Sequence, residues 1–411
     1  MAPSIWRHTD FRRLMAALAV SQLGSKLARE ALPLTAVLVL GAGPMGMTYL
    51  GIAAALPALL MALHAGAFLD RVRRRPSMIA ADFARFLLLL SVPVAALAGH
   101  LGMVQLCLIA FIVSSLTLAF DIADQAYLPG LVGRDEILKA NAAKEASLAT
   151  TEIAGPPLGG LMVQAFGGPL TILIDAVSYL FSGIFLLRIK SPEPPPAPRA
   201  QVGILLEIRA GLRLMARDDI LRPLLWSRFA RAFFSGMIGP FYVLYLVGEL
   251  KLSPGMLGLI VATGGAASLA GAALAPALAA RFPIGPGLIL AFALKTSGLA
   301  CVPLAGLFSG ASPMLMIGLL IAQQILGDGS TGYFAVVERT LRQRRVPPEY
   351  LARTGATIRL INDGSMPFAI VLAGVLAQTL GLNIILWIAV TGYALAPVIA
   401  FFSDVRKLRS L

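Results

Sequence analysis

The sequence predicts an all-α membrane protein of twelve transmembrane helices, built as two related halves of six. Three observations predict this fold class. The 411 residues are 58% hydrophobic and only 13% charged, whereas a soluble domain carries about 25% charged residues. Apolar runs long enough to cross a hydrocarbon core of roughly 30 Å recur along the whole chain. A Pro-rich segment divides these runs into two sets of six, and part of the second set repeats the first.

Each apolar run must form a helix, because lipid offers the backbone no hydrogen-bond partners. No aqueous domain of any size is predicted between them. The predicted spans are 14–39, 47–69, 77–99, 103–124, 141–165, 169–188, 220–247, 255–279, 285–308, 313–336, 352–379 and 383–403.

The 34 Lys and Arg residues are unevenly distributed. If the N-terminus is cytoplasmic, most of them fall at cytoplasmic helix ends, including the run 71–75 and the cluster 406–409, and the predicted outer loops hold only Lys251. The positive-inside rule therefore predicts that both termini are cytoplasmic. Topology thus explains the net charge of +13, and we do not expect nucleic-acid binding.

Three parts are predicted along the chain: an N-terminal half over 1–190, a cytoplasmic linker over 191–219 and a C-terminal half over 220–411. The linker begins with a Pro-rich run, which is typical of an extended spacer. Residues 203–217 follow as a basic amphipathic helix, which we expect to lie on the inner membrane surface.

An internal repeat relates the two halves. The segments 132–167 and 346–381 align without gaps, with matches at turns and helix ends such as Gly167 with Gly381. Two sets of six spans with a detectable repeat are typical of secondary transporters whose binding site lies at the interface of the halves.

The loop after the second span contains Gly66, the pair Asp70-Arg71, and then Arg74 and Arg75. This loop resembles the gate motif of the major facilitator superfamily. The resemblance implies that Asp70 faces a helix N-terminus, while the arginines pair with neighbouring carboxylates. The alternative is an ordinary basic loop that only obeys the charge rule.

The fifth span contains Gly155, Pro156, Gly159 and Gly160 in the order GPPLGG. It resembles the motif that marks the antiporter branch of the same superfamily, which implies export rather than import. Small residues also let helices approach closely, so the alternative is a helix-packing seam without a role in exchange.

Further stretches resemble the macrolide-efflux and enterobactin-exporter group of this superfamily; they lie at 11–14, 21–25, 121–129, 174–179 and 341–353. The resemblance implies the major facilitator fold and export of drugs or siderophores by exchange with protons. It also implies a bacterial cytoplasmic (inner) membrane, a functional monomer and no cofactor or metal. The sequence shows no nucleotide-binding loop, zinc motif or nucleophile elbow, so we expect no enzymatic activity.

Charged residues inside membrane helices are costly and usually line a cavity. In the first span Gln22, Ser25, Lys26 and Arg29 lie on one helical face. We expect this face to line the substrate path. The alternative is a buried pair of Lys26 with Glu30 that only fixes packing.

Four more residues are predicted to line the cavity, and three acids are predicted to carry the coupling proton. Glu152, which has no cation near it in the sequence, is expected to be an unpaired and desolvated carboxylate and is the first choice. Glu30 is the second choice. Arg359 and Asp363, four residues apart, are expected to neutralise each other. The cavity residues are Arg228, Arg231, Asp328 and Arg359, and the acids are Glu152, Glu30 and Asp363.

Several charged residues are predicted to have structural roles. Asp82 and Arg85 are expected to hold the gate loop, and Lys295 to pack against a neighbouring helix. Asp121 and Asp124 are expected to pair with the loop arginines.

Cations slightly outnumber carboxylates among the central candidates, which favours an amphipathic anion as substrate. The leading hypothesis is a proton-linked exporter of a small amphipathic molecule. An importer of an organic anion and a membrane scaffold or sensor without transport are the alternatives. The expected partners are a small-molecule substrate, protons and the lipid bilayer.

Overall fold

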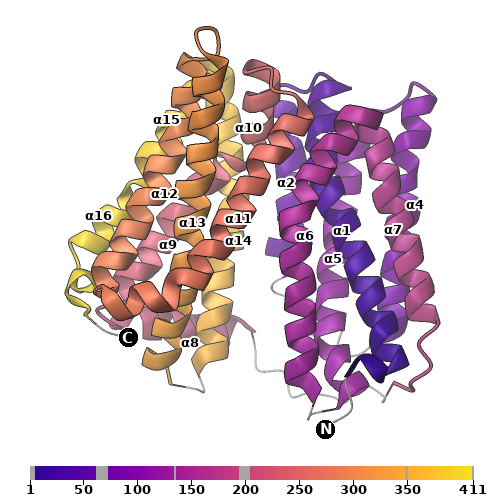
Figure 1. Ribbon diagram of the computed structural model, residues 1–411, viewed down its shortest axis with the longest axis horizontal. Coiled ribbons are helices and arrows are strands. Elements are labelled where there is room, and N and C mark those ends of the chain that lie inside the picture. Colours follow the sequence, from indigo (N-terminus) through magenta and orange to yellow (C-terminus); the bar gives the residue numbers. More distant parts are fainter. Residues whose placement is uncertain (1–4, 62–72, 134–135, 194–203, 348–349, 410–411) are drawn as a thin grey trace. The chain divides into compact units, whose positions relative to one another are not determined.

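The computed structural model describes residues 5–61, 73–133, 136–193, 204–347 and 350–409, and every regular element among them is a helix (Figure 1). The chain divides into two compact units. Each unit holds most of one predicted half and a short segment from the other. Unit 1 comprises Met1–Ala42, Ala53–Gln201 and Ser253–Gly258, and unit 2 comprises Gly43–Ile52, Val202–Leu252 and Leu259–Leu411.

Unit 1 is a bundle in which α1 packs against α6 and α7, and α4 packs against α5 and α7. Phe11, Leu14, Met78 and Leu186 are fully buried in its hydrophobic core. Helix α2 is divided between the two units. The helices are η1 (Ile5–Arg7), α1 (Thr9–Leu38), α2 (Pro44–Met61), α4 (Arg74–Leu97), α5 (Met103–Val132), α6 (Ile137–Phe166) and α7 (Gly168–Leu187).

In unit 2, α12 packs against α13, while α14 packs against α8 and α9. Its core includes Leu224, Phe292, Phe334 and Val405. The helices are α8 (Ile204–Arg217), α9 (Leu221–Gly236), α10 (Gly239–Val243), the π-helical η3 (Leu244–Glu249), α11 (Pro254–Arg281), α12 (Ile284–Leu307), α13 (Pro313–Arg345), α14 (Leu351–Leu380), α15 (Leu382–Tyr393), α16 (Leu395–Phe401) and η5 (Asp404–Lys407).

Within the described residues, eight helical stretches are long and apolar enough to cross a membrane. The four remaining predicted spans correspond to α2, which is described only as far as Met61, and to α1, α6 and α13. These last three are 30, 30 and 33 residues long. They contain five of the nine charged cavity and coupling candidates, and α9 and α14 contain the other four.

Several helices extend beyond the predicted spans, because hydropathy ends a span at its first charged residues while the helix continues. Helix α5 reaches Val132 rather than 124, and α13 reaches Arg345 rather than 336. The seventh and twelfth spans are interrupted helices. The break in the seventh precedes Gly239, as expected for a Gly-Pro step. The predicted amphipathic helix is confirmed as α8.

The internal repeat is confirmed by the backbone. Helices α6 and α14 are both 30 residues long, and both end at a glycine in an unusual conformation. Gly167 has φ 83° and ψ 161°, and Gly381 has φ 83° and ψ 159°. In each copy this single residue also precedes the next helix, α7 or α15, so the two turns are equivalent.

Asp10 fixes the start of α1 to the segment that follows α7. Its carboxylate accepts hydrogen bonds from the backbone N–H groups of Lys190 and Ser191, at 3.1 and 2.9 Å, and from the Ser191 hydroxyl at 2.7 Å. Arg13 pairs with the other oxygen at 2.7 Å. Desolvation raises the pKa of Asp10, but the bonds from Ser191, Arg13 and Lys190 outweigh it and lower the pKa to about 2.

Candidate functional site

In unit 1, two cations of α1 share one carboxylate of α6. Lys26 Nζ donates a hydrogen bond to Glu152 Oε1, and Arg29 Nη2 lies 3.2 Å from Glu152 Oε2. The Lys26 side chain is 15% exposed, whereas those of Arg29 and Glu152 are 57% and 51% exposed. The set, which we call the α1–α6 cluster, therefore has one positive charge in excess and is accessible through Arg29 and Glu152.

The prediction that Glu152 is unpaired and desolvated is wrong, because its partners are 126 and 123 residues away in the sequence. The alternative pairing of Lys26 with Glu30 is also absent, since Lys26 contacts Glu152. Within the described part of the chain, Glu30 has no ion pair.

The predicted polar face of α1 is divided between different surroundings. Ser25 Oγ lies 2.7 Å from the Tyr179 hydroxyl of α7, and it donates a hydrogen bond to the Ser21 carbonyl at 2.6 Å. Gln22 Oε1 is buried without a hydrogen-bond partner among the described residues. Only Lys26 and Arg29 of the four predicted residues therefore belong to the α1–α6 cluster.

Two glycines of the GPPLGG motif set the distance between α6 and α1. A Cβ atom at Gly155 would overlap Lys26 Cβ, and one at Gly159 would lie 3.3 Å from Glu30 Cβ. Gly155 follows Glu152 by three residues and so lies on the same face of α6. Close packing at Gly155 is thus what brings Lys26 within reach of Glu152.

The third motif glycine has a counterpart in the repeat. In unit 1 a Cβ atom at Gly160 would overlap the Pro254 carbonyl oxygen, and in unit 2 a Cβ atom at Gly374 would overlap Thr48. The carbonyl of Pro156, within α6, likewise faces Gly258. Each of these contacts brings the first turn of another helix against α6 or α14.

Gly155→Ala is expected to destabilise the protein by about 1–3 kcal/mol, the usual cost of overpacking, because the added methyl group must push α1 away from α6. The midpoint of thermal unfolding in detergent measures this. Gly130→Ala on α5 is the matched control, since a Cβ atom there meets nothing within 4 Å, and helix propensity favours Ala. If both variants unfold at the wild-type temperature, Gly155 is not a packing constraint.

A buried polar group connects three helices of unit 1. Arg85 on α4 pairs with Asp82, and Ser182 on α7 donates to the other oxygen of Asp82 at 2.7 Å. The Arg85 guanidinium lies 4.1 Å from the ring centroid of Tyr179, whose hydroxyl reaches Ser25 on α1. Asp82 and Arg85 therefore join α4 to α7, and Tyr179 extends this group to the residue beside Lys26.

Of the gate motif, Gly66, Asp70 and Arg71 lie outside the described residues. Among the described residues, the expected pairing of the arginine side chains with carboxylates is not found for Arg74 and Arg75, which donate to backbone carbonyls. Arg74 reaches Ala126 at 2.9 Å, and Arg75 reaches the carbonyls of residues 186 and 187 at 3.0 and 2.8 Å. The last carbonyls of a helix lack intrahelical donors, which explains the Arg75 contacts at the end of α7.

The carboxylate near these arginines contacts their backbone. Glu193 accepts hydrogen bonds from the N–H groups of Arg74 at 2.6 Å and Arg75 at 3.1 Å, at the N-terminus of α4. The expected pair of Asp124 with the loop arginines is not found among the described residues, where Asp124 pairs with Lys144 of α6. No ion pair of Asp121 is found among the described residues.

Unit 2 contains a buried ionic cluster that sequence reasoning found only in part. Arg228 of α9 pairs with Glu338 of α13, and Arg342 lies 3.7 Å from the other oxygen of Glu338. The Arg228 and Arg231 guanidinium groups each lie 5.4 Å from the ring centroid of Phe334. Arg228 and Glu338 are 9% and 3% exposed, so Arg228 is not an open cavity cation.

Glu338 is the missed residue of this cluster. It lies in a basic run that hydropathy assigns to a loop, whereas α13 continues through it. The spacing of four residues between Glu338 and Arg342 is the signal that could have indicated a helix there.

The remaining candidates also have defined surroundings. Asp328 of α13 pairs with Lys295 of α12 at 2.7 Å, so Lys295 contacts a neighbouring helix as predicted. The expected pair of Arg359 and Asp363 is not formed in the described part of α14. No three His, Cys, Asp or Glu side chains converge as a metal site within the described residues.

Four and five residues before Asp328, two glutamines of α13 form hydrogen bonds with a tyrosine of α10. Tyr242 donates to Gln323 Oε1 at 2.9 Å, and Gln324 Nε2 donates to the Tyr242 hydroxyl at 3.3 Å. These uncharged hydrogen-bonding residues are not among the predicted site residues. Gln324 lies one helical turn from the predicted cavity residue Asp328.

Comparison with known sequences agrees with the superfamily resemblance. A model of the transmembrane secretion effector family matches residues 1–411. The chain is 28% identical over 341 residues to the multidrug efflux pump Tap of Mycolicibacterium fortuitum, covering 80% of each protein. It is 25% identical over 391 residues to the uncharacterized transporter YvqJ of Bacillus subtilis, covering 92% of this chain and 88% of that protein.

Solved structures share the fold. A bacterial homologue of the iron transporter ferroportin, in its inward-facing state, matches with a TM-score of 0.77 at 16% identity, over 97% of this chain and 99% of that one. The nucleoside transporter NupG matches with a TM-score of 0.74 at 12% identity, over 95% and 97%. The predicted all-α membrane fold is thus confirmed. The chain belongs to the transmembrane secretion effector family of the major facilitator superfamily, a family of secondary transporters rather than enzymes.

Proposed function

We propose that this transporter exports a small amphipathic molecule, drug-like or siderophore-like, in exchange for protons by alternating access. The observation that carries the proposal is the α1–α6 cluster, in which Lys26 and Arg29 share Glu152. Ionisable groups in membrane helices are energetically costly, and they usually mark substrate pathways or proton relays. The efflux pump among the relatives supports the direction of transport.

Competition at Glu152 would produce the exchange. A substrate that donates hydrogen bonds or carries positive charge binds ionised Glu152, and a proton on the same carboxylate removes its attraction. Proton and substrate then occupy the site alternately, which is the condition for antiport. Glu30 on α1 and Asp363 on α14 are the further acids in this proposal.

The cytoplasmic loop has the second role in the proposal. Gly66, Asp70 and Arg71, together with Arg74 and Arg75, govern the switch between the two open states. Arg74 contacts a carbonyl within α5 and Arg75 contacts the last carbonyls of α7, and these contacts support the role because they connect the start of α4 to both helices. We place both termini and this loop on the cytoplasmic side of a bacterial inner membrane, with a monomer as the functional form.

A second candidate function is import of an organic anion together with protons. The excess positive charge of the α1–α6 cluster favours it. Protonation of Glu152 would release Lys26 and Arg29, so an anion and a proton would bind at the same time and move in the same direction. The sign of coupling therefore separates the two candidates.

Purified protein in lipid vesicles tests both, with an imposed pH gradient and either a lipophilic cation or an aromatic carboxylate as substrate. We expect substrate to move against the direction of proton flow, which is exchange. Movement in the same direction would support the anion importer. If no substrate moves in either direction, while the protein is folded and inserted, the transport proposal is wrong and a scaffold role gains support.

A further inference from the structure

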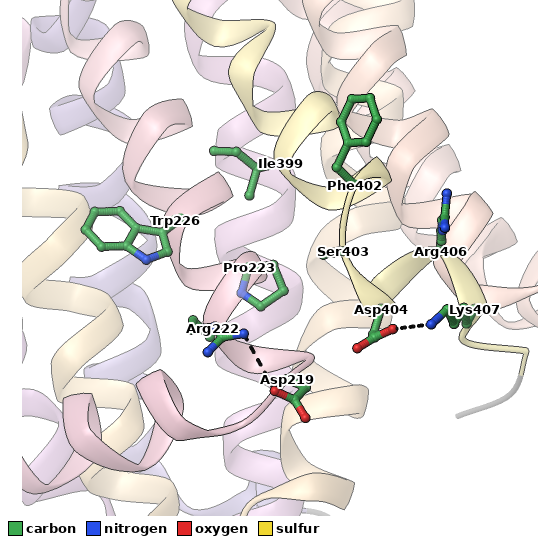
Figure 2. Close-up of a pocket in the computed structure, with 10 residues that line it drawn as sticks. All are labelled: Asp219, Arg222, Pro223, Trp226, Ile399, Phe402, Ser403, Asp404, Arg406 and Lys407. Atoms are coloured by element: carbon green, nitrogen blue, oxygen red, sulfur yellow. Dashed lines mark hydrogen bonds and ion pairs between the residues drawn. The ribbon is translucent and has the colours of Figure 1, made fainter.

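In unit 2 a cleft of about 460 Å³ opens where α9 begins and the chain ends. Its two sides differ in chemistry. In Figure 2 the pairs Asp219–Arg222 and Asp404–Lys407 lie below Trp226, Ile399 and Phe402. Arg406 lies higher than these two pairs, nearer to Phe402. The cleft is therefore amphipathic, with two ion pairs at one side and apolar side chains together with Arg406 at the other.

The lining of the cleft has more cations than carboxylates. Arg222 Nη2 lies 3.6 Å from Asp219 Oδ1, and Lys407 Nζ lies 2.6 Å from Asp404 Oδ1. The hydrogen bond and charge of Lys407 hold the pKa of Asp404 below its usual value, so the Asp404 carboxylate is ionised at neutral pH. Arg406 has no ion pair among the described residues, and its guanidinium lies 6.0 Å from the Phe401 ring centroid. The cleft thus has an excess of one positive charge.

The apolar side lies on helices that are long and apolar enough to cross a membrane. Trp226 of α9 is 58% exposed and Phe402, directly after α16, is 79% exposed. Large exposed aromatic residues at the ends of membrane helices are typical of the zone where acyl chains meet lipid headgroups. The two sides together match the boundary between hydrocarbon and water.

The segment that carries the cations is held in place. Val405, between Asp404 and Arg406, is fully buried in the core of unit 2. The Gly285 N–H of α12 donates to the Leu408 carbonyl at 2.8 Å. Arg406 and Lys407 are therefore attached to a packed element rather than to a loose end, as a binding site requires.

From this arrangement we infer that the cleft binds the headgroup of an anionic phospholipid. The lipid phosphate lies against Arg222, Arg406 and Lys407, and the glycerol and first acyl carbons lie against Trp226 and Phe402. Basic pockets between membrane helices are known to select anionic lipids. A free phosphate ion would make no contact with the apolar side of the cleft, whereas a phospholipid contacts both sides. This inference concerns lipid recognition and does not depend on the proposed substrate or direction of transport.

Trp226 provides a direct test. The chain has three tryptophans, so Trp6→Phe and Trp387→Phe leave Trp226 as the only reporter. This protein is reconstituted in phosphatidylcholine vesicles that contain increasing fractions of phosphatidylglycerol with brominated acyl chains, which quench indole fluorescence. We expect the quenching of Trp226 to reach its maximum while brominated phosphatidylglycerol is still a small fraction of the lipid. Brominated phosphatidylcholine should quench only in proportion to its amount.

Arg406→Gln/Lys407→Gln should reduce the preference for phosphatidylglycerol by about fivefold for each cation removed, given about 1 kcal/mol per surface cation. Arg409→Gln is the matched control, because it removes a charge from the same tail outside the cleft. Phe402→Ala should weaken the binding of both lipids. Equal quenching by the two lipids, an unchanged preference in the double variant, or displacement of the lipid by millimolar inorganic phosphate would each overturn the inference.

Discussion

Replacing Glu152 with Gln is expected to abolish substrate accumulation driven by a pH gradient, while the protein remains folded and inserted. Lys26 and Arg29 share this carboxylate, and Gln preserves its shape but cannot exchange a proton. Accumulation in lipid vesicles should fall to the level of vesicles without protein. Binding of a cationic substrate should weaken by about 1–3 kcal/mol, the scale of a hydrogen bond to a charged group, and should no longer change with pH.

The same variant separates the two candidate functions. If the substrate is an organic anion, Glu152→Gln removes its competitor and should tighten binding, whereas Lys26→Gln should weaken it by about 1–3 kcal/mol. Equilibrium binding to purified protein gives the sign directly. Glu145→Gln is the matched control, because Glu145 is exposed and lies two turns earlier on α6. If Glu152→Gln protein still responds fully to the gradient, another acid carries the proton, and Glu30→Gln is the next variant to measure.

The largest loss of stability is expected at the buried cluster of unit 2. Arg228→Met should leave the buried Glu338 without its closer partner, so that among the described residues it keeps only the longer contact to Arg342, at 3.7 Å. Breaking a buried ion pair from one side costs about 3–5 kcal/mol. Thermal unfolding in detergent should therefore show a marked fall in midpoint, and Glu338→Gln should show a comparable fall.

The double variant Arg228→Met/Glu338→Leu should recover much of this loss, because removing both charges also removes their desolvation cost. Arg339→Gln provides the control, since Arg339 is adjacent to Glu338 but exposed. Additive losses in the double variant would show that the two side chains stabilise the protein independently and that their pairing contributes little.

Features that depend on a regular period or on backbone geometry could be predicted from the sequence. The amphipathic pattern of 203–217 predicts a helix, and the described residues show it as α8, which ends at the predicted Arg217. The repeat aligns Gly167 with Gly381, and the two glycines do form equivalent turns at the ends of α6 and α14. Neither result requires knowledge of which helices are neighbours.

Side-chain partners could not be predicted in the same way, because they depend on which helices pack together. Lys26 has Glu30 one turn away but pairs with Glu152, and nothing local to either residue indicates this choice. Glu338 falls in a predicted loop, because hydropathy cannot distinguish a helix that leaves the membrane from one that ends there. The gate residues Gly66, Asp70 and Arg71 remain a prediction.

The turns at Gly167 and Gly381 also bear on the history of the chain. Both glycines have a positive φ with ψ near 160°, a backbone region that is essentially closed to every other residue. Lipid-facing positions of the two copies can exchange one apolar residue for another, so their common origin is lost there by drift. A position that admits a single residue type cannot drift. After a duplication, such positions retain the ancestral residue longest, and a search for divergent copies of this half should give them the greatest weight.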